Sequence, residues 1–298
     1  MKKMYLGLLA LSMLACNTDK KPSEQAFQES QQNAAKEKKP ELSKEVIKDF
    51  IQSIPSPVEI SLLIKEQGAS YDKSLLNPTK HASNYNTNFK QALNLGIYST
   101  DLGYANIYDQ KQDAFLYLDA VRGMADGLNL GQFFDFSTIK RLATNSSNLD
   151  SLLLITTQNF EKINAHLQDQ DRAHLSALIL TGGWLEALYL TCETVKKHPD
   201  QSFKERIGEQ KIILDQLLLV LDFYKEDPNT QKLINELTAL RQNFDKVEVT
   251  KVYKESSMKE VDGVMMVVDN STSKINVTDE DINNIFNKTV AIRNQVIQ

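Results

Sequence analysis

Apolar residues recur at intervals of three or four positions along most of the chain after residue 84, and this spacing predicts a succession of amphipathic helices. We expect helices at about 85–108, 110–128, 137–142, 148–167, 170–197, 201–225 and 229–246, and a final one from Thr278. Pro199 and Pro228 fall at two of the joints, where proline commonly begins or ends a helix. Two shorter helices are expected between Ser43 and Gly68, followed by a polar stretch.

The pattern changes near the C-terminal end, where the apolar residues no longer follow helical spacing. Valines lie among charged residues from Val247 to Val252, and residues 264–268 form a run of valine and methionine. These features predict a small β-hairpin or an extended arm at about 247–269. The expected fold is therefore all-α, a multi-helix bundle or helical array, with this small β-insert.

The N-terminal residues have the pattern of an export signal. Lys2 and Lys3 precede an apolar stretch, Met4–Leu14, that is shorter than the about 20 residues needed to span a bilayer. The stretch ends in Met-Leu-Ala-Cys at residues 13–16, which resembles the lipobox of bacterial lipoproteins. The resemblance implies cleavage before Cys16 and attachment of fatty acyl chains to it. Two or three such chains hold a protein on a membrane.

This resemblance divides the chain into a signal peptide (1–15), a lipidated cysteine with a tether (16–42) and a single helical domain (43–298). The tether is rich in Lys, Glu, Gln and Pro, a composition that does not bury enough apolar surface to fold. Asn17 follows the cysteine, whereas the enteric inner-membrane retention rule favours aspartate there. We therefore expect the outer membrane, on either its periplasmic or its surface face.

Composition excludes several other classes of function. The net charge of -5 gives no reason to expect a nucleic-acid partner. Because Cys16 is assigned to lipid, Cys192 has no partner for an internal disulfide and is expected to be a small buried hydrophobe. The four histidines do not fall at metal-ligand spacings, and no nucleophile or phosphate-binding motif occurs. We therefore expect no metal, no cofactor and no motif-defined catalytic residue.

A weak internal repeat relates two of the predicted helices. When the chain is aligned with itself at one constant offset, similar residues are paired: Ala92 with Ala177, Leu93 with Leu178, Leu95 with Leu180, Asp101 with Glu186 and Tyr104 with Tyr189. Either two amphipathic helices share common residues, or a three-helix unit has been duplicated.

The same two helices carry the candidate site. One helix face presents Ile97, Asp101, Tyr104 and Tyr108, and its counterpart presents Gly182, Glu186, Tyr189 and Glu193. An acid on an apolar stripe needs a partner if it is buried, and two acids facing one cavity would raise at least one pKa. The candidate ligand-binding residues are Asp101, Tyr104, Tyr108, Glu186 and Tyr189.

Three functions are compatible with these features. The first is a lipid-anchored envelope protein that acts as a binding or protein-interaction module, for another envelope protein or for a small ligand near Asp101 and Glu186. The alternative is a hydrolytic enzyme that uses the paired carboxylates on an envelope polymer. Glycosidases need two carboxyls roughly 5–9 Å apart across a cleft. The third is a purely structural spacer.

Overall fold

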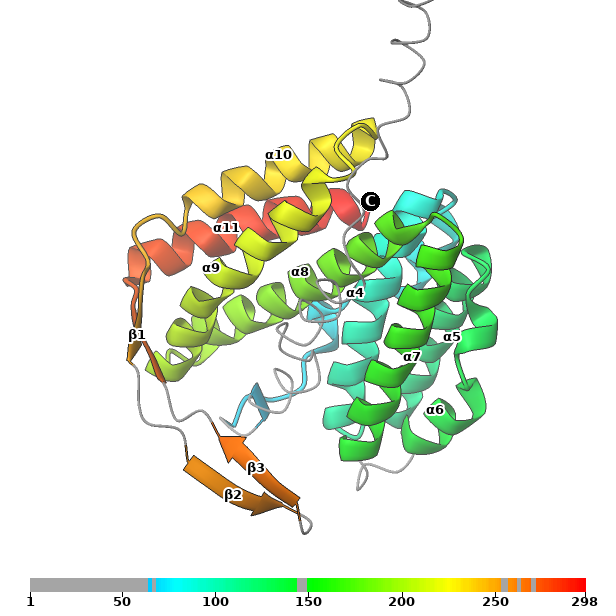
Figure 1. Cartoon of the computed structure of the whole chain (residues 1–298), viewed down its shortest axis with the longest axis horizontal. Helices are drawn as coiled ribbons and strands as arrows, with labels where there is room; N and C mark the ends of the chain where they lie inside the picture. The colour runs from blue at the N-terminus through cyan, green and yellow to red at the C-terminus, as the bar shows by residue number, and fades with distance from the viewer. Residues whose placement is uncertain (1–63, 66–67, 144–148, 253–256, 262–263, 269–271) are drawn as a thin grey trace, which may run out of the picture. The chain divides into compact units, whose positions relative to one another are not determined.

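The helices and strands follow the order that the sequence predicts (Figure 1). The computed structural model describes residues 64–65, 68–143, 149–252, 257–261, 264–268 and 272–298. Its helices are α4 (Asn88–Ile107), α5 (Lys111–Gly127), α6 (Phe136–Ala143), α7 (Leu149–Asp169), α8 (Ala173–Lys197), α9 (Gln201–Asp222), α10 (Pro228–Gln242) and α11 (Asp279–Val296). Short 3-10 turns lie at η1 (Lys73–Leu75), η2 (Thr79–Asn84) and η3 (Gly131–Phe133). The prediction of an all-α helical array with a small β element is confirmed.

The described residues belong to one compact unit, Leu42–Gln298. The predicted signal peptide, Cys16 and most of the tether fall before this unit, outside the described residues. The helices expected between Ser43 and Gly68 also lie outside them, apart from residues 64–65.

Local signals in the sequence set where several helices begin. The Thr87 side chain accepts a hydrogen bond from the backbone of the first turn of α4, and the Asp227 side chain does the same for α10, whose first residue is Pro228. Thr278 and Asp281 form a reciprocal capping box at the start of α11. These side chains satisfy backbone N–H groups that have no partner within the helix.

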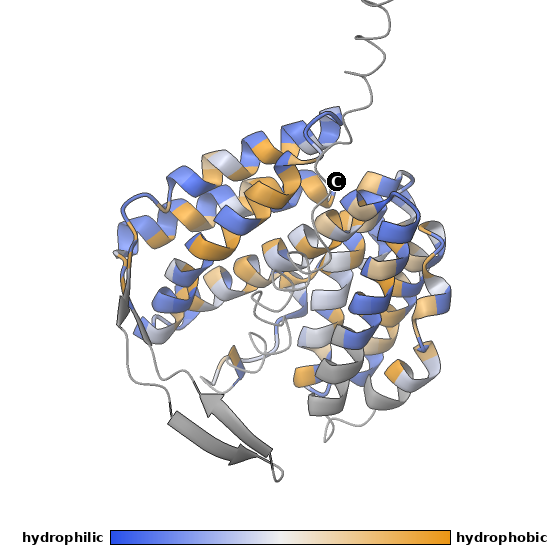
Figure 2. Ribbon diagram, in the orientation of Figure 1, coloured by the Kyte–Doolittle hydropathy of each residue, from blue (hydrophilic) through white to orange (hydrophobic). Residues whose placement is uncertain are grey.

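α8 is the central helix of the described structure. It packs against α4, α7, α9 and α11, which leaves little of its surface free. α8 is long and apolar enough to cross a membrane by length and composition, but 89% of its most apolar window is buried inside the protein. Figure 2 shows hydrophilic residues along α10, whereas α8 carries few. Apolar residues all round a helix are typical of such a core position.

α4 and α8 approach each other closely because glycines line their contact. A Cβ atom at Gly96 would lie 2.0 Å from the carbonyl oxygen of Ile179, and one at Gly182 would lie 1.9 Å from that of Leu93. The hydroxyl of Thr100 hydrogen-bonds across the same contact to the carbonyl oxygen of Gly183, at 3.2 Å. The two helices related by the weak repeat are therefore direct neighbours.

The β-insert consists of two strand pairs nested one inside the other. β1 (Glu248–Val252) pairs antiparallel with β4 (Thr272–Asn276), and β2 (Ser257–Val261) pairs antiparallel with β3 (Val264–Val268). The strands thus extend to residue 276, beyond the predicted 269. The outer pair contacts α9, where Ile275 packs over Gly208.

Candidate functional site

The two predicted acids meet in the core. Asp101 on α4 and Glu186 on α8 are both 0% exposed, and Glu186 lies close enough to raise the pKa of Asp101. The close packing of α4 against α8 brings the two acids together. The weak internal repeat in the sequence aligns the same two residues.

Arg293 on α11 completes this pair, and the sequence analysis did not single it out. Its guanidinium donates two hydrogen bonds to Glu186, from Nε to Oε2 and from Nη2 to Oε1, both at 2.6 Å. The guanidinium carbon also lies 4.0 Å from the ring centroid of Tyr189. A signal was present, since Arg293 follows Ile285, Thr289 and Ile292 on the buried face of its helix.

The charges of this cluster balance if Asp101 keeps its proton. Burial, and then the neighbouring Glu186, raise the pKa of Asp101 well above its ordinary value, while Arg293 opposes the rise. Burial alone would lower the pKa of Arg293, but the interaction with Glu186 outweighs burial and raises that pKa. With Asp101 neutral, the cluster has one negative group, Glu186, and one positive group, Arg293.

Residues 72–80, here called the strap, cross over the cluster. The Asn77 backbone N–H donates to Asp101 Oδ2 at 3.1 Å, and Arg293 Nη2 donates to the Leu75 carbonyl oxygen at 2.9 Å. The buried Asn77 side chain donates to Tyr85 at 3.1 Å and to Asn94 at 3.2 Å. The buried polar groups therefore fix the backbone of a segment that has little regular structure.

The predicted tyrosines separate into two groups. Tyr189 belongs to the cluster, where burial raises its pKa to about 12. Tyr104 instead stacks on Tyr71, with ring centroids 5.3 Å apart, and the ring of Tyr108 is tilted against both, at 5.7 Å from Tyr71 and 4.9 Å from Tyr104. Tyr104 accepts a hydrogen bond from the Asp72 backbone at 3.2 Å, and Tyr108 donates to the Ala69 carbonyl at 2.7 Å. All of these polar groups are used within the protein.

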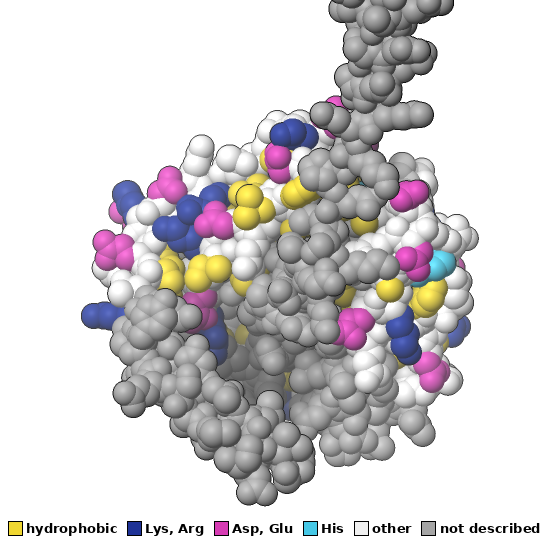
Figure 3. Space-filling view, in the orientation of Figure 1, with side chains coloured by type: hydrophobic (Ala, Val, Ile, Leu, Met, Phe, Trp, Pro, Cys, Tyr) yellow, Lys and Arg dark blue, Asp and Glu magenta, His cyan; other side chains and the backbone are white. Residues whose placement is uncertain are grey.

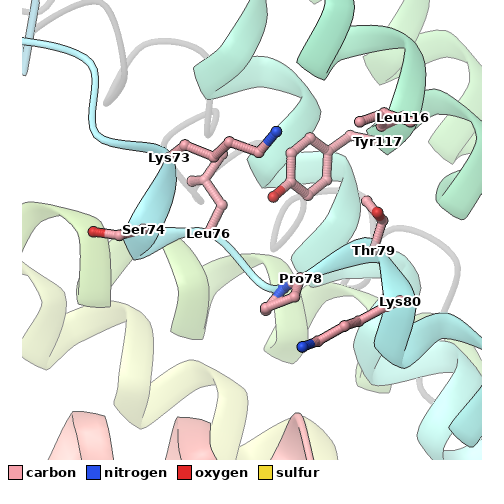
Figure 4. A pocket seen from close by; sticks show the side chains of 8 residues that line it. All are labelled: Lys73, Ser74, Leu76, Pro78, Thr79, Lys80, Leu116 and Tyr117. Atoms are coloured by element: carbon pink, nitrogen blue, oxygen red, sulfur yellow. The ribbon is translucent and has the colours of Figure 1, made fainter.

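A pocket lies against the strap, between it and α5 (Figure 4). Its volume is about 240 Å³, and it is lined by Lys73, Ser74, Leu76, Pro78, Thr79, Lys80, Leu116 and Tyr117. Figure 4 shows the ring of Tyr117 at the centre, with its hydroxyl directed toward Leu76 and the stem of Lys73. The sequence analysis did not predict this site, because its residues come from a polar stretch and from an exposed turn of α5.

No protein-family model, curated protein or solved structure matches this chain. Within the described ranges, no group of three or more metal-ligating side chains comes together. Cys192 is buried, and burial raises the pKa of its thiol, so it stays protonated and unreactive at neutral pH. The buried ion cluster and the pocket are therefore the candidate sites among the predicted residues and cavities of the described part of the chain.

Proposed function

We propose that the protein is a lipid-anchored binding module of the bacterial cell envelope that captures a small ligand in the strap pocket. The single observation that carries the proposal is a pocket whose strap wall is held in place by buried hydrogen bonds from Asn77 and Arg293. A wall that is already ordered costs little conformational entropy when a ligand binds. Small-ligand sites are usually such preformed hollows with a few polar groups.

The anchor part of the proposal rests on the lipobox-like residues 13–16 and on the polar tether that follows them. The proposed location is the outer membrane, with the acyl chains of Cys16 as the membrane contact. A tether of this composition lets the domain reach ligands away from the lipid surface.

The hydrolytic alternative has less support. Neither Asp101 nor Glu186 is exposed, and both oxygens of Glu186 accept hydrogen bonds from Arg293. A glycosidase needs both carboxyls at the scissile bond of a bound sugar. A carboxylate held in this way contributes to stability and has no access to a polymer.

Protein interaction is a second candidate function, and α9 favours it. Ile212, Leu219 and Phe223 repeat at helical spacing, and Leu219 is 68% exposed. Figure 3 shows hydrophobic side chains at the surface on the face where α9 lies. Exposed apolar stripes of this kind are typical of contact surfaces.

Two measurements test the proposal on the full chain in its native host. Metabolic labelling with a radioactive fatty acid should label the wild type and not Cys16→Ala, and equal labelling of both would contradict the anchor. Native mass spectrometry of the membrane-extracted protein should show an added small mass that disappears on denaturation. A bare chain mass, with partners captured instead by crosslinking at Leu219, would favour the protein-interaction function.

A further inference from the structure

We propose that the strap pocket selects a small anionic amphiphile, a carboxylate group on a short apolar body. This inference rests on the proposed ligand-binding function and specifies the ligand. It follows from three properties of the lining residues: their charge, their apolar surface and one phenol.

The lining has two cationic side chains, Lys73 and Lys80, and no acidic one. Lys73 forms an ion pair with Asp113, just outside the lining. Among the described residues, no ion-pair partner is found for the exposed Lys80. Within the described part of the chain, the pocket therefore has one positive charge without an ion-pair partner, which favours an anion and disfavours a cation.

The rest of the lining is largely apolar. Leu76, Pro78 and Leu116 face the pocket together with the ring of Tyr117. Leu116 is 46% exposed, so its apolar surface is in contact with water when the pocket is empty. An apolar ligand body would cover this surface and remove it from water, which stabilises the complex in proportion to the area buried.

Tyr117 supplies a hydrogen-bond donor at the meeting point of the charged and apolar parts. Tyr117 is buried, and its ring lies beside that of Tyr98, with the two ring centroids 6.2 Å apart. Burial raises its pKa, so the phenol keeps its proton at neutral pH. A protonated phenol can donate to a carboxylate oxygen.

The volume limits the size of the ligand. Pockets for drug-sized ligands usually measure about 300–1,000 Å³, and this one is smaller, at about 240 Å³. A medium-chain carboxylate fits this limit, whereas the bulk of a two-chain phospholipid does not.

The test compares three probes with the same alkyl chain: octanoate, octanol and octylammonium. Binding to the full chain in lipid nanodiscs is measured by isothermal titration calorimetry, with protein-free nanodiscs as the blank. We expect octanoate to bind at least about tenfold more tightly than either other probe, a difference of about 1.4 kcal/mol.

Two variants locate the charge and the donor. Lys80→Gln should weaken octanoate binding about tenfold and leave octanol unchanged, a loss of about 1.4 kcal/mol. Tyr117→Phe should weaken octanoate several-fold while it keeps the ring. Lys232→Gln on the exposed side of α10, which does not line the pocket, is the matched control and should bind like the wild type.

The outcomes separate the two proposals. If octanol or octylammonium binds as tightly as octanoate, or if Lys80→Gln binds octanoate normally, the anion preference is wrong and small-ligand binding stands. If none of the three probes binds the folded wild type, the anionic-amphiphile inference is overturned, whereas the small-ligand function is overturned only by a bare chain mass in native mass spectrometry.

Discussion

The strap lies between the ion cluster and the pocket. Both regions contain charged side chains, but those of the cluster are buried and those of the pocket are exposed. In the ion cluster, Asp101, Glu186 and Arg293 are buried, and Arg293 is paired with Glu186. In the pocket, Lys73 and Lys80 are exposed, and among the described residues an ion-pair partner is found for Lys73 alone of the two. Burying a charged side chain is costly unless it is paired, so buried charged groups hold the segments that contact them in fixed positions. Exposed charged groups keep their hydration and remain available to a ligand.

The difference should be largest in the energetic cost of removing one charge. Glu186→Gln leaves the Arg293 guanidinium buried without its carboxylate, and we expect a loss of about 3–5 kcal/mol in the free energy of unfolding. Urea denaturation followed by circular dichroism measures it. Glu209→Gln, which removes an exposed pair with Arg206 on α9, is the control and should cost less than about 1 kcal/mol. Equal losses would mean that burial of the cluster has no energetic consequence.

The close contact that places the two acids together offers the next test. Gly182→Ala would bring a Cβ atom to 1.9 Å from the Leu93 carbonyl oxygen, so α4 and α8 must move apart. Such overpacking typically costs about 1–3 kcal/mol. Gly123→Ala on α5 meets no atom within 4 Å and should stabilise the helix by up to about 1 kcal/mol. In thermal denaturation, we expect Gly182→Ala to lower the melting temperature and Gly123→Ala to raise it.

Proton binding should distinguish the regions next. Because the pKa of Asp101 is raised in the folded protein, the native state keeps a proton that the unfolded chain releases above about pH 4. Stability then falls by up to about 1.4 kcal/mol per pH unit until the pH passes the folded pKa. Asp101→Asn cannot lose a proton, so its stability should lack this fall. Parallel pH profiles of wild type and variant, measured by urea denaturation, would rule out a protonated Asp101.

The smallest effect is expected at the surface. Lys73→Gln removes the ion pair with Asp113, whose lysine side chain is 58% exposed. Exposed pairs contribute about 0–1 kcal/mol, and salt screens them. Thermal denaturation at low and high salt should show a small difference that disappears at high salt. A loss as large as that of Glu186→Gln would remove the distinction between the two regions.

The sequence predicted the helices well because their signals are local. Apolar spacing, caps such as Thr278 and breaks such as Pro228 act within one turn of the chain. The encounter of Asp101 with Glu186 was also within reach, since the weak repeat aligned these two residues.

The remaining parts of the site depend on contacts between distant residues. Arg293 lies 107 positions from Glu186, and no local pattern reports such a pair. The stretch around Asn77 is polar and has the pattern of an exposed loop, yet the Asn77 side chain is buried, and its NH2 group donates to Tyr85 and Asn94. Tyr108 shares a helix face with Asp101, but seven residues of helix separate them by about 10 Å.

The residues that meet at the ion cluster are far apart along the chain, and this separation indicates when the cluster forms during folding. The hydrogen bonds of Arg293 to Leu75 and of Tyr85 to Ile297 close loops of 218 and 212 residues. Long loops are costly to close early, whereas each α-helical hairpin forms from near neighbours. We therefore expect the cluster to assemble after the folding barrier, so that weakening it accelerates unfolding and leaves the refolding rate almost unchanged.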